Sequence, residues 1–181
     1  MRGLKRLFLG VVLLSAVMVA VAFALPRNVS VERAEVINAP ESDIFVYLNS
    51  PKKFNDWSPW AEKDPDAHYI FSGPPAGKGA GMAWDSDNPQ VGSGRQEIVE
   101  SVENRSVKVA LDFGDQGTAT ATFELVPAGA GTKVIWRFST DTGNNPLKRW
   151  AGLLFDRWVG AEYERGLARL KELVETQGGG R

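Results

Sequence analysis

Few side chains in this sequence can carry out nucleophilic, acid–base or metal chemistry, because it contains one histidine and no cysteine. Asp64, Asp66 and His68 have a spacing that, on a strand, would place two oxygens and one nitrogen on the same side, as a metal site requires. Pro65 favours a solvated turn there instead. We therefore expect no metal and no cofactor. Serine hydrolase chemistry is also excluded, because His68 is the one imidazole and lies in this turn.

Two loop segments match known ligand loops only in part. Residues 73–79 are glycine-rich like a phosphate loop, but the segment is one residue short, lacks Ser or Thr after Lys78, and precedes a strand. Residues 85–88 begin like a calcium loop, but Pro89 stands at a ligand position and the required glycine is missing. We interpret the second segment as a hairpin turn and expect no phosphate at the first.

The distribution of charged residues argues against nucleic acid as a partner and against a charged binding site. Four of the 21 basic residues lie in residues 1–27, which contain no acid, so the rest of the chain is mildly acidic and nucleic acid is not an expected partner. Arg137, Glu162 and Arg165 could bring charge towards a binding site, but we expect them to form surface salt bridges.

Aromatic side chains are the best candidates for a binding site, because small-molecule pockets are mostly apolar. The candidate ligand-binding residues are Trp84, Phe113, Phe123, Trp136, Phe138, Trp150, Phe155 and Trp158. The alternative is that these rings fill a solid core. Ala119 and Ala121 are small and favour a cavity beside them. Trp57 and Trp60 could form a mouth or a membrane contact, but we expect this loop to pack on the sheet.

Elements that could position these rings follow from the pattern of apolar residues. Alternation over 107–113 and 119–125, separated by a Gly-Asp-Gln-Gly turn, predicts an antiparallel hairpin, and 133–138 predicts a further strand. The segment 29–37 is β-prone. Weaker strand signals occur at 68–72, 81–84 and 96–102. A helix is expected from about Pro40 to Asn49, followed by a second short helix from Pro51 towards Trp57.

Residues 145–176 predict one long helix, because apolar residues recur at helical spacing and no proline interrupts them after Pro146. The stripe consists of Leu147, Ala151, Leu154, Trp158, Leu167, Leu170 and Val174. We expect Trp158 to face the sheet near the strand that carries Trp136 and Phe138. Residues 177–181 are expected to form a disordered tail.

The N-terminal segment 1–27 predicts a membrane anchor. Leu7–Leu25 is apolar or small except for Ser15, and as a helix it spans roughly 28 Å, against a hydrocarbon core of about 30 Å. A cleaved signal peptide is the alternative, because residues 20–22 and 22–24 fit an A-x-A cleavage site. In either case the three basic residues before the segment keep the N-terminus in the cytoplasm and send the remainder across.

Several motifs together resemble one family. They are Phe45–Leu48, Phe54–Trp60, Gly79–Trp84, Gly92–Gly94, Gly131–Trp136 and Gly166–Lys171. Their order is similar to that of the polyketide cyclase/dehydrase-like branch of the SRPBCC superfamily, which includes START domains and the birch-pollen allergens. The resemblance covers about residues 30–176 and implies an α+β helix-grip fold. In that fold a curved antiparallel sheet of about six or seven strands surrounds a long C-terminal helix and an apolar cavity.

We therefore predict three parts: residues 1–27 as an anchor or signal, 28–176 as a helix-grip domain, and 177–181 as a tail. The leading functional hypothesis is a single-pass protein of the cytoplasmic membrane whose extracytoplasmic domain binds an apolar small molecule or lipid. One alternative is a cyclase or aromatase-type enzyme, which would use positioned acids or hydroxyls in the cavity. Another is a domain with a filled core that binds a protein partner.

Overall fold

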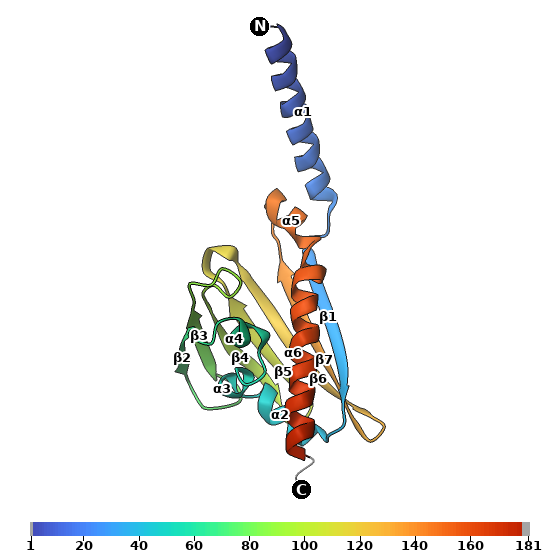
Figure 1. Ribbon diagram of the computed structural model, residues 1–181. Coiled ribbons are helices and arrows are strands. Elements are labelled where there is room, and N and C mark those ends of the chain that lie inside the picture. The colour runs from blue at the N-terminus through green and yellow to red at the C-terminus, as the bar shows by residue number, and fades with distance from the viewer. Residues whose placement is uncertain (1, 179–181) are drawn as a thin grey trace.

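Seven antiparallel strands form one curved sheet in the order β1-β7-β6-β5-β4-β3-β2 (Figure 1). The computed structural model describes residues 2–178. The strands are β1 (Asn28–Ile37), β2 (His68–Ser72), β3 (Gly81–Asp85), β4 (Gly94–Val102), β5 (Ser106–Asp112), β6 (Thr118–Ala128) and β7 (Gly131–Asp141). Their alternating burial, clearest in β6 and β7, follows the predicted alternation of apolar and polar residues.

The first strand of the sheet lies beside the last one. β1 pairs with β7 along its whole length, from Asn28 opposite Asp141 to Ile37 opposite Thr132. A Cβ at Gly131 would lie 2.2 Å from the carbonyl oxygen of Ile37, so only glycine fits at this close approach. The pairing brings the segment after the N-terminal helix next to the segment that follows β7.

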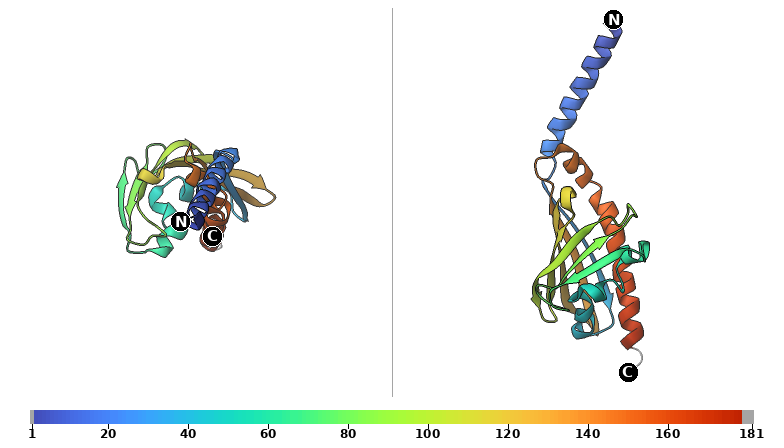
Figure 2. Two further views of the ribbon diagram at one scale, coloured as in Figure 1. Left: turned by 90° about the horizontal axis from the view of Figure 1, so that it is seen from above. Right: turned by 90° about the vertical axis from the view of Figure 1, so that its left-hand side faces the viewer.

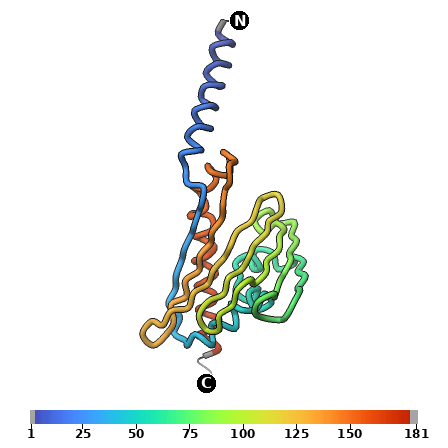
Figure 3. Tube along the Cα trace, turned by 180° about the vertical axis from the view of Figure 1, so that it is seen from behind, coloured from blue at the N-terminus to red at the C-terminus, as the bar shows by residue number. Residues whose placement is uncertain are grey.

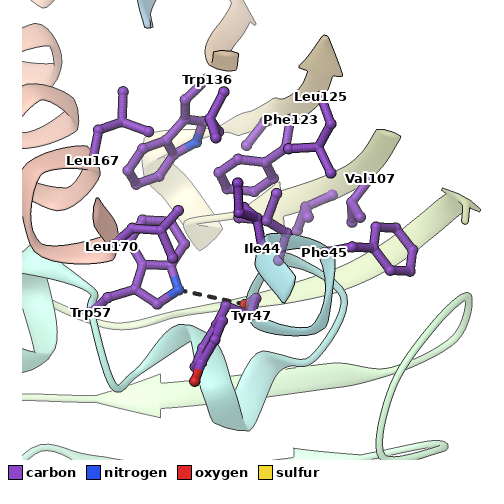
Figure 4. Packing of buried hydrophobic residues seen from close by; sticks show 14 of the residues in the cluster. Ile44, Phe45, Tyr47, Trp57, Val107, Phe123, Leu125, Trp136, Leu167 and Leu170 are labelled. Carbon is purple, nitrogen blue, oxygen red and sulfur yellow. Dashed lines mark hydrogen bonds between the residues drawn. The ribbon is translucent and has the colours of Figure 1, made fainter. Parts of the chain in front are cut away.

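Three short helices and one long helix cover the inner face of the sheet (Figure 2). The first two predicted short helices are present as α2 (Glu41–Leu48) and α3 (Pro51–Phe54), and a third, α4 (Pro59–Lys63), follows Trp57. Pro51 and Pro59 each begin a helix, where the missing N–H costs nothing. Figure 4 shows how Ile44, Trp57, Phe123, Trp136 and Leu170 pack between these helices and the sheet.

The C-terminal helix differs from the prediction of one continuous element. It is divided into α5 (Pro146–Gly152) and α6 (Phe155–Gly178) by a tight turn, in which the N–H of Leu153 bonds to Trp150 and that of Leu154 to Ala151. The cause is tertiary packing, because Gly152 lies so close to Val29 of β1 that a Cβ would be 2.9 Å from its side chain.

The break changes which residues face the sheet. Leu167, Leu170 and Val174 of α6 are buried, as the stripe predicts. Trp158 is 52% exposed, so the expectation that it faces the sheet is wrong, and Leu147 and Leu154 are exposed with it. α6 extends through residue 178, and the last three residues of the predicted tail lie outside the described residues.

The N-terminal helix α1 (Arg2–Ala24) projects from the domain and lies against α5 at its base (Figures 1 and 3). It is long and apolar enough to cross a membrane. Its side chains are almost all exposed, with Ala22 as the buried exception among its described side chains. This exposure is unlike that of a core helix in a water-soluble domain.

Candidate functional site: an apolar cavity between the sheet and α6

A cavity of about 320 Å³ lies between the inner face of the sheet, helices α3 and α4, and the first half of α6. Alternating strand residues point into it, since successive side chains of a strand face opposite sides. Ala119 and Ala121 of β6 line it, and their small side chains leave space that larger residues would fill. The size lies within the range of small-molecule sites, about 300 to 1,000 Å³.

Six of the eight predicted site residues line this cavity. They are Trp84, Phe113, Phe123, Trp136, Phe138 and Phe155. Trp150 and Trp158 are not among the lining residues, and this is the correction to that set. Trp150 lies on α5 and donates its indole N–H to the carbonyl of Met18 in α1, at 3.2 Å. The turn at residues 153–154 directs Trp158 towards solvent.

Trp136 is the centre of the aromatic wall. It lies between the ring of Trp57, at 5.2 Å between centroids, and the ring of Tyr163, which stacks on it at 3.7 Å. Trp57 is fully buried and donates its indole N–H to the carbonyl of Tyr47 at 3.5 Å, so this loop packs on the sheet as predicted. Trp60, its partner in the sequence motif, lines the cavity.

Tyr163 of α6 is a cavity residue that the sequence analysis missed. Burial raises the pKa of its phenol, although a contact with Trp136 acts in the opposite direction. The phenol therefore stays neutral and can serve as a hydrogen-bond donor. The sequence contains a signal for it: Phe155, Val159 and Tyr163 recur every four residues and continue to Leu167 of the predicted stripe. Two other members of that stripe, Leu154 and Trp158, lie on a different face of the helix.

Charged groups stay outside the cavity. Among residues 2–178, no Asp, Glu, His, Lys or Arg lines it. Arg137 pairs with Glu32 and Glu124 on the outer face, and Arg165 pairs with Glu162 at 3.6 Å, so all three residues form salt bridges. Glu162 is largely buried and also bonds to Lys63 at 2.6 Å.

The other candidate ligand groups form no site. Within the described part of the chain, no three His, Asp or Glu side chains come together as metal ligands. Asp64 instead accepts hydrogen bonds from the Ser86 hydroxyl and from the Asp66 backbone. Tyr69 lies at the cavity edge, where burial and the nearby charge of Asp64 raise the pKa of its phenol.

The family described as "Polyketide cyclase / dehydrase and lipid transport" matches residues 28–175, which is most of the chain and all of the sheet. The chain belongs to this family. The match begins where β1 begins and ends near the end of α6, so the N-terminal helix lies outside it. No curated protein sequence matches the chain.

Several solved structures share the fold of this chain. The chain is similar to the di-domain ARO/CYC StfQ of the steffimycin biosynthetic pathway, with a TM-score of 0.63 and 15% identity over 84% of this chain and 52% of that one. It is similar to protein Ms6760 from Mycobacterium smegmatis (TM-score 0.57, 14% identity, 82% and 92% covered). It is also similar to Ara h 8.0201 (TM-score 0.58, 11% identity, 82% and 99% covered).

These likenesses establish the helix-grip fold, and the family description supports a domain that binds a hydrophobic ligand. At such identities the structures show the fold alone, because one fold hosts many functions.

Proposed function

We propose that this family member is a membrane-tethered, extracytoplasmic module that binds an apolar small molecule or lipid in the cavity between the sheet and α6. The observation that carries the proposal is the cavity's lining, which is mostly aromatic and aliphatic and has no charged side chain among the described residues. Such a lining gains free energy by taking apolar surface out of water, about 25 cal/mol per Å².

Polar groups at a few positions would orient the ligand. The side chains of Asn55, Gln96, Gln116 and Tyr163 belong to the lining and offer amide groups and a hydroxyl. A cavity of about 320 Å³ is at the small end of ligand sites, so it suits one acyl chain or one compact ring system better than a two-chain phospholipid.

The same lining argues against acid–base catalysis. A general acid or base must lie within hydrogen-bond reach of the reacting atom and titrate near the working pH. Neither a carboxylate nor an imidazole faces the cavity among residues 2–178, and the raised pKa of Tyr163 keeps its phenol protonated. Binding is therefore favoured over a cyclase or aromatase reaction.

The N-terminal sequence supports a membrane tether and an extracytoplasmic position of the domain. Arg2, Lys5 and Arg6 precede the apolar run and favour a cytoplasmic N-terminus, so the domain that follows α1 would be outside. A ligand site that stands next to the bilayer suits a water-insoluble ligand, because the membrane is the reservoir of such molecules.

The test is native mass spectrometry of the full chain extracted in mild detergent, followed by solvent extraction and identification of the released molecule. We expect wild-type protein to carry an apolar molecule. The variant Ala121→Leu should lose it, because the added carbons occupy the cavity, while its free energy of unfolding stays near that of wild type.

The matched control is Ala110→Leu, at an exposed position on the outer face of β5, which should keep the molecule. If wild-type protein carries nothing and binds no apolar fluorescent probe, the proposal is wrong and the cavity is an unfilled part of the core. If Ala121→Leu lowers the free energy of unfolding by about 1 to 3 kcal/mol, the cavity has no space for a larger side chain at that position.

A further inference from the structure

Helix α5 is joined to the end of α1 by a buried arginine. The Arg149 guanidinium, on a residue 8% exposed, donates to the carbonyls of Phe23 at 3.0 Å and Leu25 at 3.3 Å. The last carbonyls of a helix have no partner within it, and a cation at that end also meets the negative end of the helix dipole. Arg149 satisfies both requirements, so α5 is held against the last turn of α1.

A second contact fixes the depth of α5 along α1. The indole N–H of Trp150 donates to the carbonyl of Met18, at 3.2 Å. Met18 lies six residues before the end of α1 at Ala24, which is roughly 9 Å along the helix axis. The apolar run to Leu25 is only about as long as the hydrocarbon core is thick, so its last two turns cannot stand clear of a bilayer that α1 crosses. Trp150 would then lie in the membrane interface, which indole side chains prefer.

Large apolar side chains surround this point and face outward. The exposed fractions are 78% for Leu147, 54% for Leu153, 43% for Leu154 and 52% for Trp158. They come from α5, the turn after it and the first turns of α6, which stand together at the base of α1 (Figure 1). Apolar side chains gathered in this way mark a surface that is covered by something.

The cavity has its exposed rim at the same end of the domain. Of the lining residues within the described chain, Gln116 and Thr118 are the exposed ones. Gln116 lies on the connection from β5 to β6, and Thr118 is the first residue of β6. The Lys148 ammonium of α5 donates to the backbone carbonyl of Gln116 at 3.0 Å and to that of Asp115 at 3.4 Å. The rim and α5 are therefore tied together.

We propose that Leu147, Trp150, Leu153, Leu154 and Trp158 form an interfacial surface that rests in the headgroup region of the bilayer entered by α1. The inference rests on the membrane tether of the proposed function. It adds that the domain lies on the membrane rather than hanging free of it, with the cavity rim beside the bilayer. An apolar ligand then passes between cavity and bilayer without a path through bulk water.

The bilayer is favoured over a second protein as the occupant because the surface is continuous with α1. Arg149 and Trp150 contact the backbone of the anchor itself, so whatever surrounds the last turns of α1 also reaches α5. An interfacial segment buries its apolar face about 5 to 10 Å into the headgroup and acyl boundary. Leu147 and Leu153, the most exposed of the set, should reach that depth.

The absence of cysteine makes single-site labelling direct. The full chain would be reconstituted into vesicles of phosphatidylcholine and phosphatidylglycerol and labelled with a nitroxide at Leu147→Cys, Leu153→Cys, Val126→Cys or Val12→Cys. Val126 is 42% exposed near the β6–β7 turn, at the end of the domain away from α1, and is the matched control (Figure 3). Collisions with oxygen, which concentrates in lipid, would be compared with collisions with a water-soluble nickel chelate.

We expect labels at 147 and 153 to gain collisions with oxygen and lose collisions with the chelate, relative to the label at 126. If they collide with the chelate as often as the control while the label at 12 is shielded from it, the anchor stands and the interfacial surface is refuted. If they lose collisions with both reagents, a protein covers the surface, and the proposal is also refuted. If the label at 12 is open to the chelate, the tether itself is wrong.

Discussion

Tyr163 places a hydroxyl inside an otherwise apolar aromatic wall, and its protonation state decides what it can do. Its side chain is 2% exposed and stacks on Trp136. Removing the phenolate from water is unfavourable, so burial raises the pKa above the ordinary value of 10.0. At neutral pH the hydroxyl is therefore a donor for a carbonyl or hydroxyl of a bound ligand.

The raised pKa predicts a loss of stability at alkaline pH. The folded chain holds the Tyr163 proton above pH 10, where the unfolded chain releases it, so this contribution to stability is complete below pH 10 and falls as the pH rises further. The Tyr163 phenol should fail to ionise in the native protein until it unfolds, as measured by the ultraviolet absorbance of phenolate. In Tyr163→Phe, the phenol that ionises only on unfolding should be absent, and stability should fall less steeply with pH, while Tyr69, whose pKa is also raised, still ionises above pH 10. Ionisation of all three phenols in the folded wild type near pH 10 would contradict the buried position of Tyr163.

Much of the cavity wall on the strands could be predicted from the sequence. Phe123, Trp136 and Phe138 follow strict alternation, which fixes the face on which each side chain lies once the strand is recognised. The helix residues were harder to assign. Val159 and Tyr163 were missed, because the phase of the stripe was carried from α5 into α6 across a turn that no proline or glycine pattern in the sequence marks clearly.

At the scale of elements, the turn between α5 and α6 depends on contacts with residues distant in sequence. Gly152 packs on Val29 of β1, and Arg149 binds the end of α1, so α5 takes its direction from segments more than a hundred residues earlier. Local propensity favours one uninterrupted helix here, and tertiary packing overrides it. The sheet order was equally non-local in origin, but alternation and turn residues predicted its hairpins, and the family resemblance supplied the overall fold.

The crossing of α6 over the sheet depends on a glycine. A Cβ at Gly166 would lie 2.9 Å from the Trp136 ring and 3.1 Å from Pro59, distances at which the ring or the helix must move. Gly166→Ala should therefore lower the free energy of unfolding by about 1 to 3 kcal/mol, although helix propensity alone favours alanine by about 1 kcal/mol. Urea unfolding of the detergent-solubilised chain measures the change.

The control is Ala168→Gly, at an exposed position of the same helix, which should lose about 1 kcal/mol through propensity alone. Gly166→Ala and Ala168→Gly are opposite substitutions, and both are expected to lower the free energy of unfolding. A Gly166→Ala variant more stable than wild type would mean that α6 does not approach Trp136 this closely.

For the whole molecule, the pairing of β1 with β7 brings the segment that follows α1 and the segment that leads into α5 to one end of the domain. Arg27, three residues after α1, forms a salt bridge with Asp141 at 2.7 Å and accepts a backbone hydrogen bond from Thr142 at 2.9 Å. The hydrogen bond from Arg27, and then that from the Gly143 N–H, lower the pKa of Asp141 to about 2. The junction keeps its charges at any physiological pH, and α1 leaves the domain beside α5 (Figure 2).

That arrangement leads to a prediction of topology. Arg2, Lys5 and Arg6 precede α1, and residues 28–178 follow it, so the sheet should lie outside the cytoplasm and remain attached to the membrane. Alkaline phosphatase fused to the C-terminus should be active, because that enzyme requires the disulfides that form only after export. The native chain should also stay in the membrane pellet after alkaline carbonate washing.

A fluorescent protein that folds only in the cytoplasm, fused at the same position, is the matched control and should remain dark. Mature protein beginning at Phe23 or Leu25 and released by the wash would show that α1 is a cleaved signal, which removes the tether but keeps the export. If the phosphatase fusion is inactive and the fluorescent-protein fusion is bright, both the export and the external tether are wrong.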